Sequence, residues 1–445
     1  MRECYPVKIL ALFPYNGRSH HIYFSTFVEE LAARKHSVVV VNYFPLKNDS
    51  NLRQISLQEG GITRDTVEIE DSDGASGIFK EFSFAYDTAK AFKHIANDNC
   101  RRLVNNRHIK EMIDSEERFD VIIVEQFVTD CGFAIANRFK APIVGMAAHV
   151  MFPWTYSRLG ADDHPAFVPN HFTGAGPTPD LWERIKSTLI NLFFNVYHRH
   201  FIQRSDNEIV REAFPDTPNL VTLVNNMSLL MLNQYFPLTG SRVYGANVVE
   251  IGGMHVKRQG IRDRNLQSFL DSAKNGVIYI SFGSVASDLP KRKMEVILNV
   301  IKHSELRFIW KIENTDDFTI PSNVLTRKWL PQVDILCHEN VLGFISHSGM
   351  LSSSEAMHCG VPVVSVPLFG DQFANAASAR AVGLGVTIHL EDLEENTLDV
   401  ALKTILRERH RWPSRRQGRL PLTVVLHGRQ IAAPATVRPR IDVRK

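Results

Sequence analysis

The stretch from 329 to 372 reads WLPQVDILCHENVLGFISHSGMLSSSEAMHCGVPVVSVPLFGDQ. Its two apolar runs, VLGFIS (341–346) and VPVVSVP (361–367), are almost continuous, which is typical of parallel strands covered on both faces. We predict a helix at 349–359 between them and a shorter one near 331–338 before them. A strand, a helix and a second strand form a βαβ unit, so this stretch predicts a parallel sheet flanked by helices.

The same alternation recurs along the chain. KILALF (8–13) and SVVVVNYF (37–44) enclose an amphipathic stretch, and FDVIIVEQF (119–127) begins another strand–helix–strand pattern. In the second half, GVIYISFGS (276–284) and RFIWKI (307–312) are further apolar runs separated by helical patterns. Both halves are therefore predicted to be α/β, each with its own doubly wound parallel sheet.

The glycine-rich stretch after residue 239 is the best candidate for a linker between the two halves. We predict an N-terminal α/β domain over 1–240, a linker over 241–262 and a C-terminal α/β domain over 263–406. Ligands of such sheets bind in the crevice at the carboxyl ends of the strands. A cleft shared by the two domains is the expected site.

Residues 407–445 differ in character from the rest of the chain. They carry eleven Arg and Lys residues against two acidic ones and have no periodic apolar face. We predict a basic, disordered tail. The remaining residues are slightly acidic in sum, so no nucleic-acid partner is expected.

The composition is that of a globular protein, 44% hydrophobic and 22% charged. The five cysteines are far apart and form no C-x-x-C pair, so we predict neither a zinc site nor disulfides, and interpret the thiols as buried apolar groups. No apolar run approaches the ~18 residues needed to span a bilayer, and the polar start of the chain does not resemble a signal peptide. On these grounds the chain is expected to be soluble.

A site for phosphate groups is predicted where strand 341–346 ends. His347, Ser348 and Gly349 lead directly into the helix at 349–359, whose first N–H groups have no partner within the helix. These groups and the positive end of the helix dipole attract anions. The geometry favours a diphosphate ligand.

The whole stretch 329–372 resembles the signature of the UDP-glycosyltransferases, which move a sugar from a UDP-sugar to small lipophilic acceptors. The residues at the family's spacing are Trp329, Pro331, Gln332, His338, His347, Gly349, Glu355, Gly360, Pro362, Pro367, Asp371 and Gln372. The resemblance covers roughly residues 7–406 and is strongest to the insect and insect-virus branch. It implies a GT-B fold, in which two Rossmann-like domains face a central cleft.

The resemblance also implies which residues bind the UDP-sugar. They are Gly283, Ser284, Trp329, Gln332, His347, Ser348, Gly349, Ser352, Glu355, Asp371 and Gln372. Gly283 and Ser284, at the end of the run 276–284, and the four residues after strand 341–346 would hold the diphosphate. Trp329 would stack on uracil, Gln332 would reach the base edge or the ribose, and Glu355 would accept from the ribose hydroxyls. Asp371 and Gln372 would bind the sugar hydroxyls.

Two positions depart from the family pattern. Ser348 stands where many members have glycine, which still leaves a backbone N–H in place. Leu351 stands where plant and vertebrate members have asparagine, which removes a polar contact to the donor.

The resemblance places the catalytic base at His20, in the first turn of the first helix. An imidazole has an ordinary pKa of about 6.5 and can take a proton from an acceptor hydroxyl near neutral pH. The adjacent His21 would point elsewhere around the helix. Many family members support this histidine with an aspartate, and Glu125 occupies the matching position here, with Asp130 as the weaker alternative.

The reaction implied is an inverting displacement at the anomeric carbon without a metal or other cofactor, using UDP-glucose or UDP-glucuronate and a small hydrophobic acceptor. The acceptor pocket is expected around 81–100 and 150–200. The triplet Asp71-Ser72-Asp73 could indicate a metal-dependent transferase, but a solvated polar loop explains it better.

A second hypothesis remains beside the enzyme. Family members continue with a helix that crosses back to the N-terminal domain and with a membrane anchor, and this sequence has the basic tail instead. The alternative is therefore a catalytically impaired UDP-sugar or hydrophobic-ligand binding protein. The resemblance implies a location at the endoplasmic reticulum membrane, whereas the sequence shows neither signal peptide nor anchor.

Overall fold

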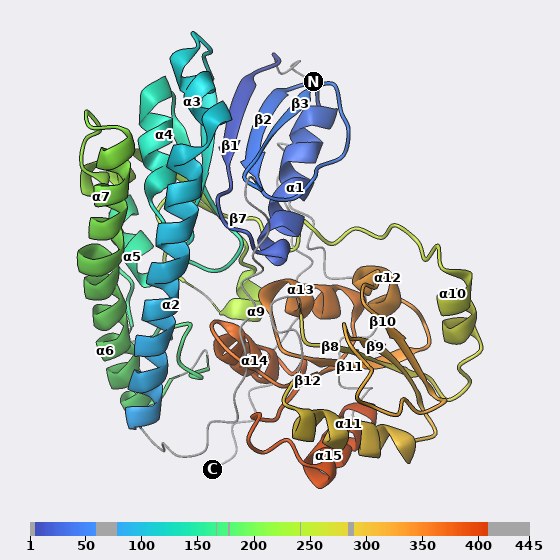
Figure 1. The fold of residues 1–445 in the computed structure, drawn as a ribbon. Coiled ribbons are helices and arrows are strands. Elements are labelled where there is room, and N and C mark those ends of the chain that lie inside the picture. The colour runs from blue at the N-terminus through green and yellow to red at the C-terminus, as the bar shows by residue number, and fades with distance from the viewer. Residues whose placement is uncertain are drawn as a thin grey trace.

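The computed structural model describes residues 5–58, 78–165, 167–176, 179–240, 242–283 and 289–407. It contains two parallel sheets, one in each half of the chain, with helices packed around them. In Figure 1 the first domain, blue to green, lies above and to the left of the second, yellow to red. The two α/β domains predicted from the apolar runs are confirmed.

The first domain is built on a seven-stranded sheet with the order β3-β2-β1-β4-β5-β6-β7. The strands are β1 (Lys8–Leu12), β2 (Ser37–Asn42), β3 (Leu52–Ser56), β4 (Val121–Glu125), β5 (Ile143–Ala147), β6 (Met227–Leu232) and β7 (Val248–Glu250). Leu10 in β1 is fully buried and is level with Val39 on one side and Ile122 on the other. The chain reverses its direction of winding between β1 and β4, which opens a crevice at their carboxyl ends.

Helices cover both faces of this sheet. They are α1 (Arg18–Ala33), α2 (Ile78–Asn105), α3 (Arg107–Asp114), α4 (Cys131–Phe139), α5 (Pro153–Tyr156), α6 (Leu181–Tyr197), α7 (Gln203–Ala213), α8 (Leu220–Leu223) and α9 (Phe236–Thr239). Short helical turns lie at η1 (Ser157–Leu159), η2 (His198–Ile202) and η3 (Val224–Asn226). The long α2 packs against α6 and α7 on the outer side of the domain (Figure 1).

The second domain has a six-stranded sheet with the order β10-β9-β8-β11-β12-β13. The strands are β8 (Val277–Ser281), β9 (Arg307–Lys311), β10 (Val324–Arg327), β11 (Val341–Ser346), β12 (Val363–Ser365) and β13 (Gly385–Thr387). The helices are α10 (Arg264–Asp271), α11 (Lys291–Lys302), α12 (Gln332–Leu336), α13 (Met350–Cys359), α14 (Gln372–Ala381) and α15 (Glu395–Arg407). Here the winding reverses between β8 and β11, so this pair marks the second crevice.

The chain passes between the domains through the segment expected to be the linker. This segment, 241–262, contains β7, which pairs with β6 at the edge of the first sheet. Helix α9 of the first domain contacts α14 of the second. These contacts hold the carboxyl edges of the two sheets opposite each other.

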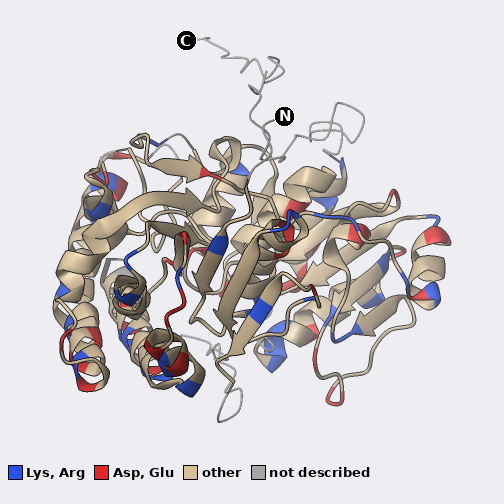
Figure 2. Cartoon of the chain, turned by 90° about the horizontal axis from the view of Figure 1, so that it is seen from above, with Lys and Arg blue, Asp and Glu red and all other residues tan. Residues whose placement is uncertain are grey.

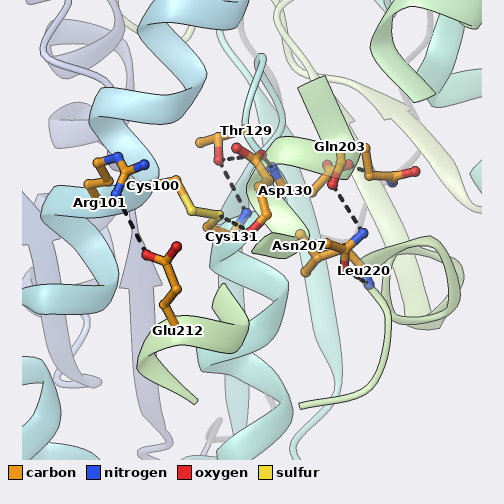
Figure 3. The surroundings of a disulfide bond; sticks show 10 residues. Cys100, Arg101, Thr129, Asp130, Cys131, Gln203, Asn207, Glu212 and Leu220 are labelled. Atoms are coloured by element: carbon orange, nitrogen blue, oxygen red, sulfur yellow. Dashed lines mark hydrogen bonds and ion pairs between the residues drawn. A yellow bond between two sulfur atoms is a disulfide. The ribbon is translucent and has the colours of Figure 1, made fainter. Parts of the chain in front are cut away.

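The interpretation of the cysteines as separate thiols is wrong for four of the five. Cys100 is bonded to Cys131 and Cys337 to Cys359, across 31 and 22 residues of sequence. Figure 3 shows the first bridge between α2 and the start of α4. The fold brings the α-carbons within 5.4 and 4.8 Å, a proximity that cysteine spacing does not reveal.

The one metal-capable cluster found among the described residues consists of Cys100, Cys131 and Asp206. Since both sulfur atoms belong to a disulfide, they are not the thiolates that zinc requires. The Asp71-Ser72-Asp73 triplet lies outside the described residues, as does the predicted basic tail beyond Arg407.

Charged residues are interspersed over both domains. In Figure 2 lysine and arginine alternate with aspartate and glutamate on the helices and loops of the described chain. Within those same residues, no helix is both long enough and apolar enough to cross a bilayer.

Candidate functional site

A cavity of about 960 Å³ lies between the two domains. Its walls come from the carboxyl ends of β1 and β4 in the first domain and of β8, β9 and β11 in the second. This is the position that the winding of open parallel sheets predicts for a ligand.

Most of the residues expected at the site meet in this cavity. Those that line it are His20, Gly283, Trp329, Gln332, His347, Gly349, Ser352, Glu355, Asp371 and Gln372. Glu125 is buried behind His20, and Ser348 is buried beside Gly349. Ser284 lies outside the described residues.

His20 and Glu125 form a partly buried hydrogen-bonded pair. Nδ1 of His20 lies 2.6 Å from Oε1 of Glu125, whose residue is 2% exposed. The backbone N–H of Tyr15 donates to the other carboxylate oxygen at 3.2 Å. Because the carboxylate engages Nδ1, Nε2 is the ring nitrogen that can accept a proton from a molecule in the cavity.

His21 and Asp130, the alternatives to His20 and Glu125, have other partners. His21 packs its ring against Phe44 at 5.1 Å, and burial lowers the pKa of His21 to about 4. Asp130 accepts two hydrogen bonds from the Arg158 guanidinium, at 2.8 and 2.9 Å, inside the first domain. Neither residue lines the cavity, so the geometry favours His20 with Glu125.

Aromatic side chains surround His20 on the side of the first domain. The rings of Tyr15 and Phe127 lie edge-on to the imidazole, with centroids at 4.7 and 4.9 Å. Further apolar groups extend this wall: Phe84, Ala91, Phe92, Ile95, Phe152 and Phe172. The segments expected to form an acceptor pocket, 81–100 and 150–200, therefore contribute to the cavity. An apolar molecule fits this wall.

His149 is a lining residue that the sequence analysis missed. Its ring stacks on Phe152 at 3.8 Å, and its Nδ1 lies 2.6 Å from the carbonyl oxygen of Val150. Burial, and then the nearby charge of His20, lower the pKa of His149 to about 3. His149 is thus neutral at physiological pH and can only serve as a hydrogen-bonding group.

The wall formed by the second domain contains the N-terminus of α13, next to the end of β11. Gly349 is the N-cap of this helix, and Ser348 adopts a positive φ of 63° just before it. The N–H of Ser348 donates to Oγ of Ser346 at 3.0 Å, so this amide already has a partner. The N–H groups of the first turn of α13 face the site, and the buried Oγ of Ser348 has no hydrogen-bond partner within the described chain. These donors suit an anion.

His347 lies between two glycines. A Cβ atom added to Gly283 or to Gly349 would come within 2.6 Å of Nε2 of His347. Gly283 also has a φ of +90°, a conformation that favours glycine. Burial, followed by the positive charge of Lys311, lowers the pKa of His347 to about 4, so the imidazole is neutral.

Gln332 links the start of α12 to α13. Its Nε2 donates to Oε2 of Glu355 at 2.6 Å and to Oγ of Ser352 at 2.9 Å. Oε1 of Glu355 lies 3.2 Å from Nε2 of His255, a buried residue after β7 that the sequence analysis did not identify. The carboxylate of Glu355 therefore lies between Gln332 of its own domain and His255 of the segment 241–262.

Trp329 is 47% exposed and presents its ring to the cavity. The guanidinium carbon of Arg18, from the first domain, lies 3.8 Å from the ring centroid. Nζ of Lys311 lies 4.8 Å from the same centroid. A planar base on this ring would share the indole with two cations.

Asp371 and Gln372 begin α14 at the opposite end of the same wall. Burial raises the pKa of Asp371, while its hydrogen bond from Asn375 and the charge of His20 lower it in part. The side-chain oxygen of Gln372 accepts from the N–H groups of Leu368 and Phe369, so its amide nitrogen is the group left for a ligand.

Known proteins resemble this chain over most of its length. Residues 8–412 match the family model described as UDP-glucoronosyl and UDP-glucosyl transferase. UDP-glucosyltransferase 2 of Dactylopius coccus is similar, with 30% identity over 90% of this chain and 78% of that protein. UDP-glucuronosyltransferase 1A9 of Mus musculus is 27% identical over 89% of this chain and 76% of its own length.

Solved structures show the same fold. A UDP-glucosyltransferase from Polygonum tinctorium, in a complex with 3,4-dichloroaniline, aligns with a TM-score of 0.57. The alignment covers 91% of this chain and 93% of that one, at 16% identity. At this identity the likeness concerns the fold alone, and it confirms the predicted GT-B arrangement of two Rossmann-like domains around a cleft.

Proposed function

The chain belongs to the UDP-glucosyl and UDP-glucuronosyl transferase family and is a glycosyltransferase that uses a UDP-sugar; we propose that it transfers glucose or glucuronate to a hydroxyl of a small lipophilic acceptor. One observation carries the proposal. His20 of the first domain, with Glu125 behind it, and the N-terminus of α13 in the second domain face one cavity. A proton acceptor therefore faces a site for a diphosphate.

In the proposed mechanism, Nε2 of His20 takes the proton of the acceptor hydroxyl as its oxygen attacks the anomeric carbon. The carboxylate of Glu125, 2.6 Å from Nδ1, stabilises the imidazolium that forms. The acceptor would lie against the aromatic wall of Phe92, Phe127 and Phe152. This wall excludes water, which would otherwise compete for the sugar.

We propose that the configuration at the anomeric carbon is inverted. The acceptor approaches from the His20 wall, and the diphosphate leaves toward α13 on the facing wall. Attack and departure on opposite sides of one carbon, in a single displacement, invert it. The amides at the start of α13 would meet the charge on the departing phosphate, so the proposal requires no metal ion.

The donor contacts are proposed residue by residue. Trp329 would hold uracil, Gln332 and Glu355 the ribose, and Asp371 and Gln372 the transferred sugar. The diphosphate would lie against His347, Ser348, Gly349, Ser352, Gly283 and Ser284. The similarity to insect glucosyltransferases favours glucose over glucuronate as the sugar.

The test uses the purified chain with UDP-glucose or UDP-glucuronate and a panel of phenols and terpenoid alcohols. We expect transfer by the wild type, and a loss of about 10²–10⁴-fold in kcat for His20→Ala. His21→Ala is the matched control, because His21 is next in sequence but does not line the cavity. Analysis of the product anomer and addition of a chelator test inversion and metal independence.

Calorimetry with UDP separates binding from transfer. UDP affinity should be unchanged in His20→Ala, since that residue acts on the acceptor. A wild-type chain that binds UDP but transfers sugar to none of these acceptors would support the binding-protein hypothesis instead.

We also propose that the chain folds in the lumen of the endoplasmic reticulum. Disulfides form and persist in oxidising compartments, and the described chain contains two, Cys100–Cys131 and Cys337–Cys359. Thiol labelling of the protein isolated from its cells should leave these four residues unmodified until a reductant is added. Ready labelling without reductant would contradict this location.

A further inference from the structure

Lys311 lies at the carboxyl end of the second sheet, beside the proposed diphosphate site. It ends β9 and is level with Ser281 of β8, which is in turn level with Ser346 of β11. It lines the cavity, and its ammonium group donates to the carbonyl oxygen of Gly283. Lys311 is thus on the strand next to the turn that packs against His347.

The contacts of this ammonium group that the structure describes are to uncharged atoms. In the described part of the chain they are the Gly283 carbonyl and the ring of Trp329, and neither carries a negative charge. Burial is the main cause that lowers the pKa of Lys311 to about 8. At pH 7 most of the molecules therefore carry a cation here, and the negative charge of Glu313 favours that cation.

His347 cannot supply this charge itself. Its pKa is lowered to about 4, and the positive charge of Lys311 is one of the causes. At neutral pH the imidazole can donate or accept a hydrogen bond but adds no charge. Of Lys311 and His347, only Lys311 carries a positive charge at neutral pH.

We propose that Lys311 is a further catalytic residue, whose ammonium group binds the diphosphate of the UDP-sugar and offsets the charge on the departing UDP. The inference rests on the proposed function and deepens it. As the acceptor oxygen bonds to the anomeric carbon, the bond from that carbon to the β-phosphate oxygen breaks and its electron pair stays on the phosphate. The hydroxyl proton goes to His20, and UDP gains one negative charge next to Lys311.

A cation at this place stabilises the transition state more than the ground state, because the phosphate charge increases as the bond breaks. The site is partly closed to water, which strengthens the attraction. Hydrogen bonds from an ammonium group to phosphate are also stronger than those from a neutral donor.

The test compares Lys311→Met, which removes the charge at similar length, with Lys311→Arg, which keeps it. We expect Lys311→Met to lower kcat by about 10²–10³-fold and Lys311→Arg to retain most of the activity. Lys302→Met is the control, since Lys302 is an exposed residue in the last turn of α11, away from the cavity. Equal losses in the Met and Arg variants would overturn the proposal, because they would indicate packing and not charge.

Binding of UDP and of uridine gives a readout that does not depend on transfer. Lys311→Met should weaken UDP binding by about tenfold or more and change uridine binding much less, since uridine has no phosphate. Retained uridine binding also shows that the variant is folded. If both ligands are affected equally, or neither is, Lys311 does not bind the diphosphate, whether or not the wild type transfers sugar.

The pH dependence provides a second readout. The titratable and charged groups around Lys311 are Glu313, two residues further along the chain, Arg18 from α1 and His347 after β11. Of these, His347 is neutral in this pH range. As the pH rises through about 8, the free protein loses the ammonium charge, so its UDP affinity should fall. Lys311→Arg should keep its affinity in this range, because a guanidinium stays protonated. A wild-type affinity that is constant from pH 7 to pH 9.5 would contradict the role.

Discussion

Nδ1 of His20 lies 2.6 Å from Oε1 of Glu125, although 105 residues separate the two along the chain. Strands β1 and β4 are neighbours in the sheet, with Leu12 level with Val124. Glu125 is the last residue of β4, and His20 lies in the first turn of the helix that follows β1. The pair thus depends on the reversal of winding between these two strands.

Replacement of Glu125 by glutamine tests this relationship. The amide oxygen can still accept a hydrogen bond from His20, but the negative charge that stabilises the imidazolium is lost. We expect kcat to fall by about 10²–10⁴-fold, with UDP affinity unchanged. Steady-state kinetics and calorimetry measure the two effects. Glu117→Gln is the control, because Glu117 pairs with Lys8 and Arg53 away from the cavity. Full activity of Glu125→Gln would show that the charge has no role.

Gly283→Ala tests the packing of His347. The new Cβ would lie 2.6 Å from Nε2 of His347, on a backbone with a φ of +90°. Gly383→Ala is a matched control in the same domain, with a φ of +74° and nothing within 4 Å of the added atom. Both variants should lose about 1 kcal/mol of stability from the backbone conformation, but only Gly283→Ala should also lose UDP affinity. Equal UDP affinity in the two variants would contradict a diphosphate site at this turn.

The buried carboxyl group of Asp206 should make the free energy of unfolding depend on pH. It is fully buried beside the Cys100–Cys131 disulfide, and burial raises its pKa to about 8. The folded protein therefore holds a proton that the unfolded chain releases near pH 4. Between about pH 4 and 8 the folded state binds more protons, so the free energy of unfolding should fall as the pH rises, by a few kcal/mol in total.

Asp206→Asn should remove this dependence. The amide oxygen can still accept the hydrogen bonds that Oδ2 of Asp206 receives from Thr129 and from the N–H of Asp130. Urea unfolding at several pH values measures the slope. Asp216→Asn, an exposed site in the same domain, is the control. An identical slope in wild type and Asp206→Asn would show that Asp206 is already ionised at neutral pH.

The Cys337–Cys359 disulfide should stabilise the second domain. It closes a loop of 22 residues between the end of α12 and the end of α13, next to the proposed donor site. Replacing both cysteines by alanine should cost about 3 kcal/mol in the free energy of unfolding. Urea unfolding with and without a reductant measures this loss. The reductant should destabilise the wild type more than the variant, and equal sensitivity would mean that this bridge does not contribute.

Local patterns were sufficient for the elements and for most of the proposed site. The runs at 341–346 and 361–367 contain β11 and β12, and the helix expected between them is α13. Gly349 was predicted from the turn that leads into its helix, and Glu355 from the resemblance to the family. Lys311 and His255 were not predicted. A lysine at a strand end and a histidine in a glycine-rich segment indicate no function until their spatial neighbours are known.

The amino-acid sequence alone determined the two α/β domains, through the periodicity of its apolar residues, and the glycosyltransferase family, through the motif at 329–372. The candidates His20 and Glu125 followed from the resemblance to that family, and His347 also from its place before the helix. Only the tertiary structure decided which side chains meet. The Cys100–Cys131 bridge, the contact of His255 with Glu355 and the cation of Lys311 beside Gly283 join residues far apart in the chain. Such contacts depend on the order of strands in a sheet and on the packing of one domain against the other, and neither is encoded in a local pattern.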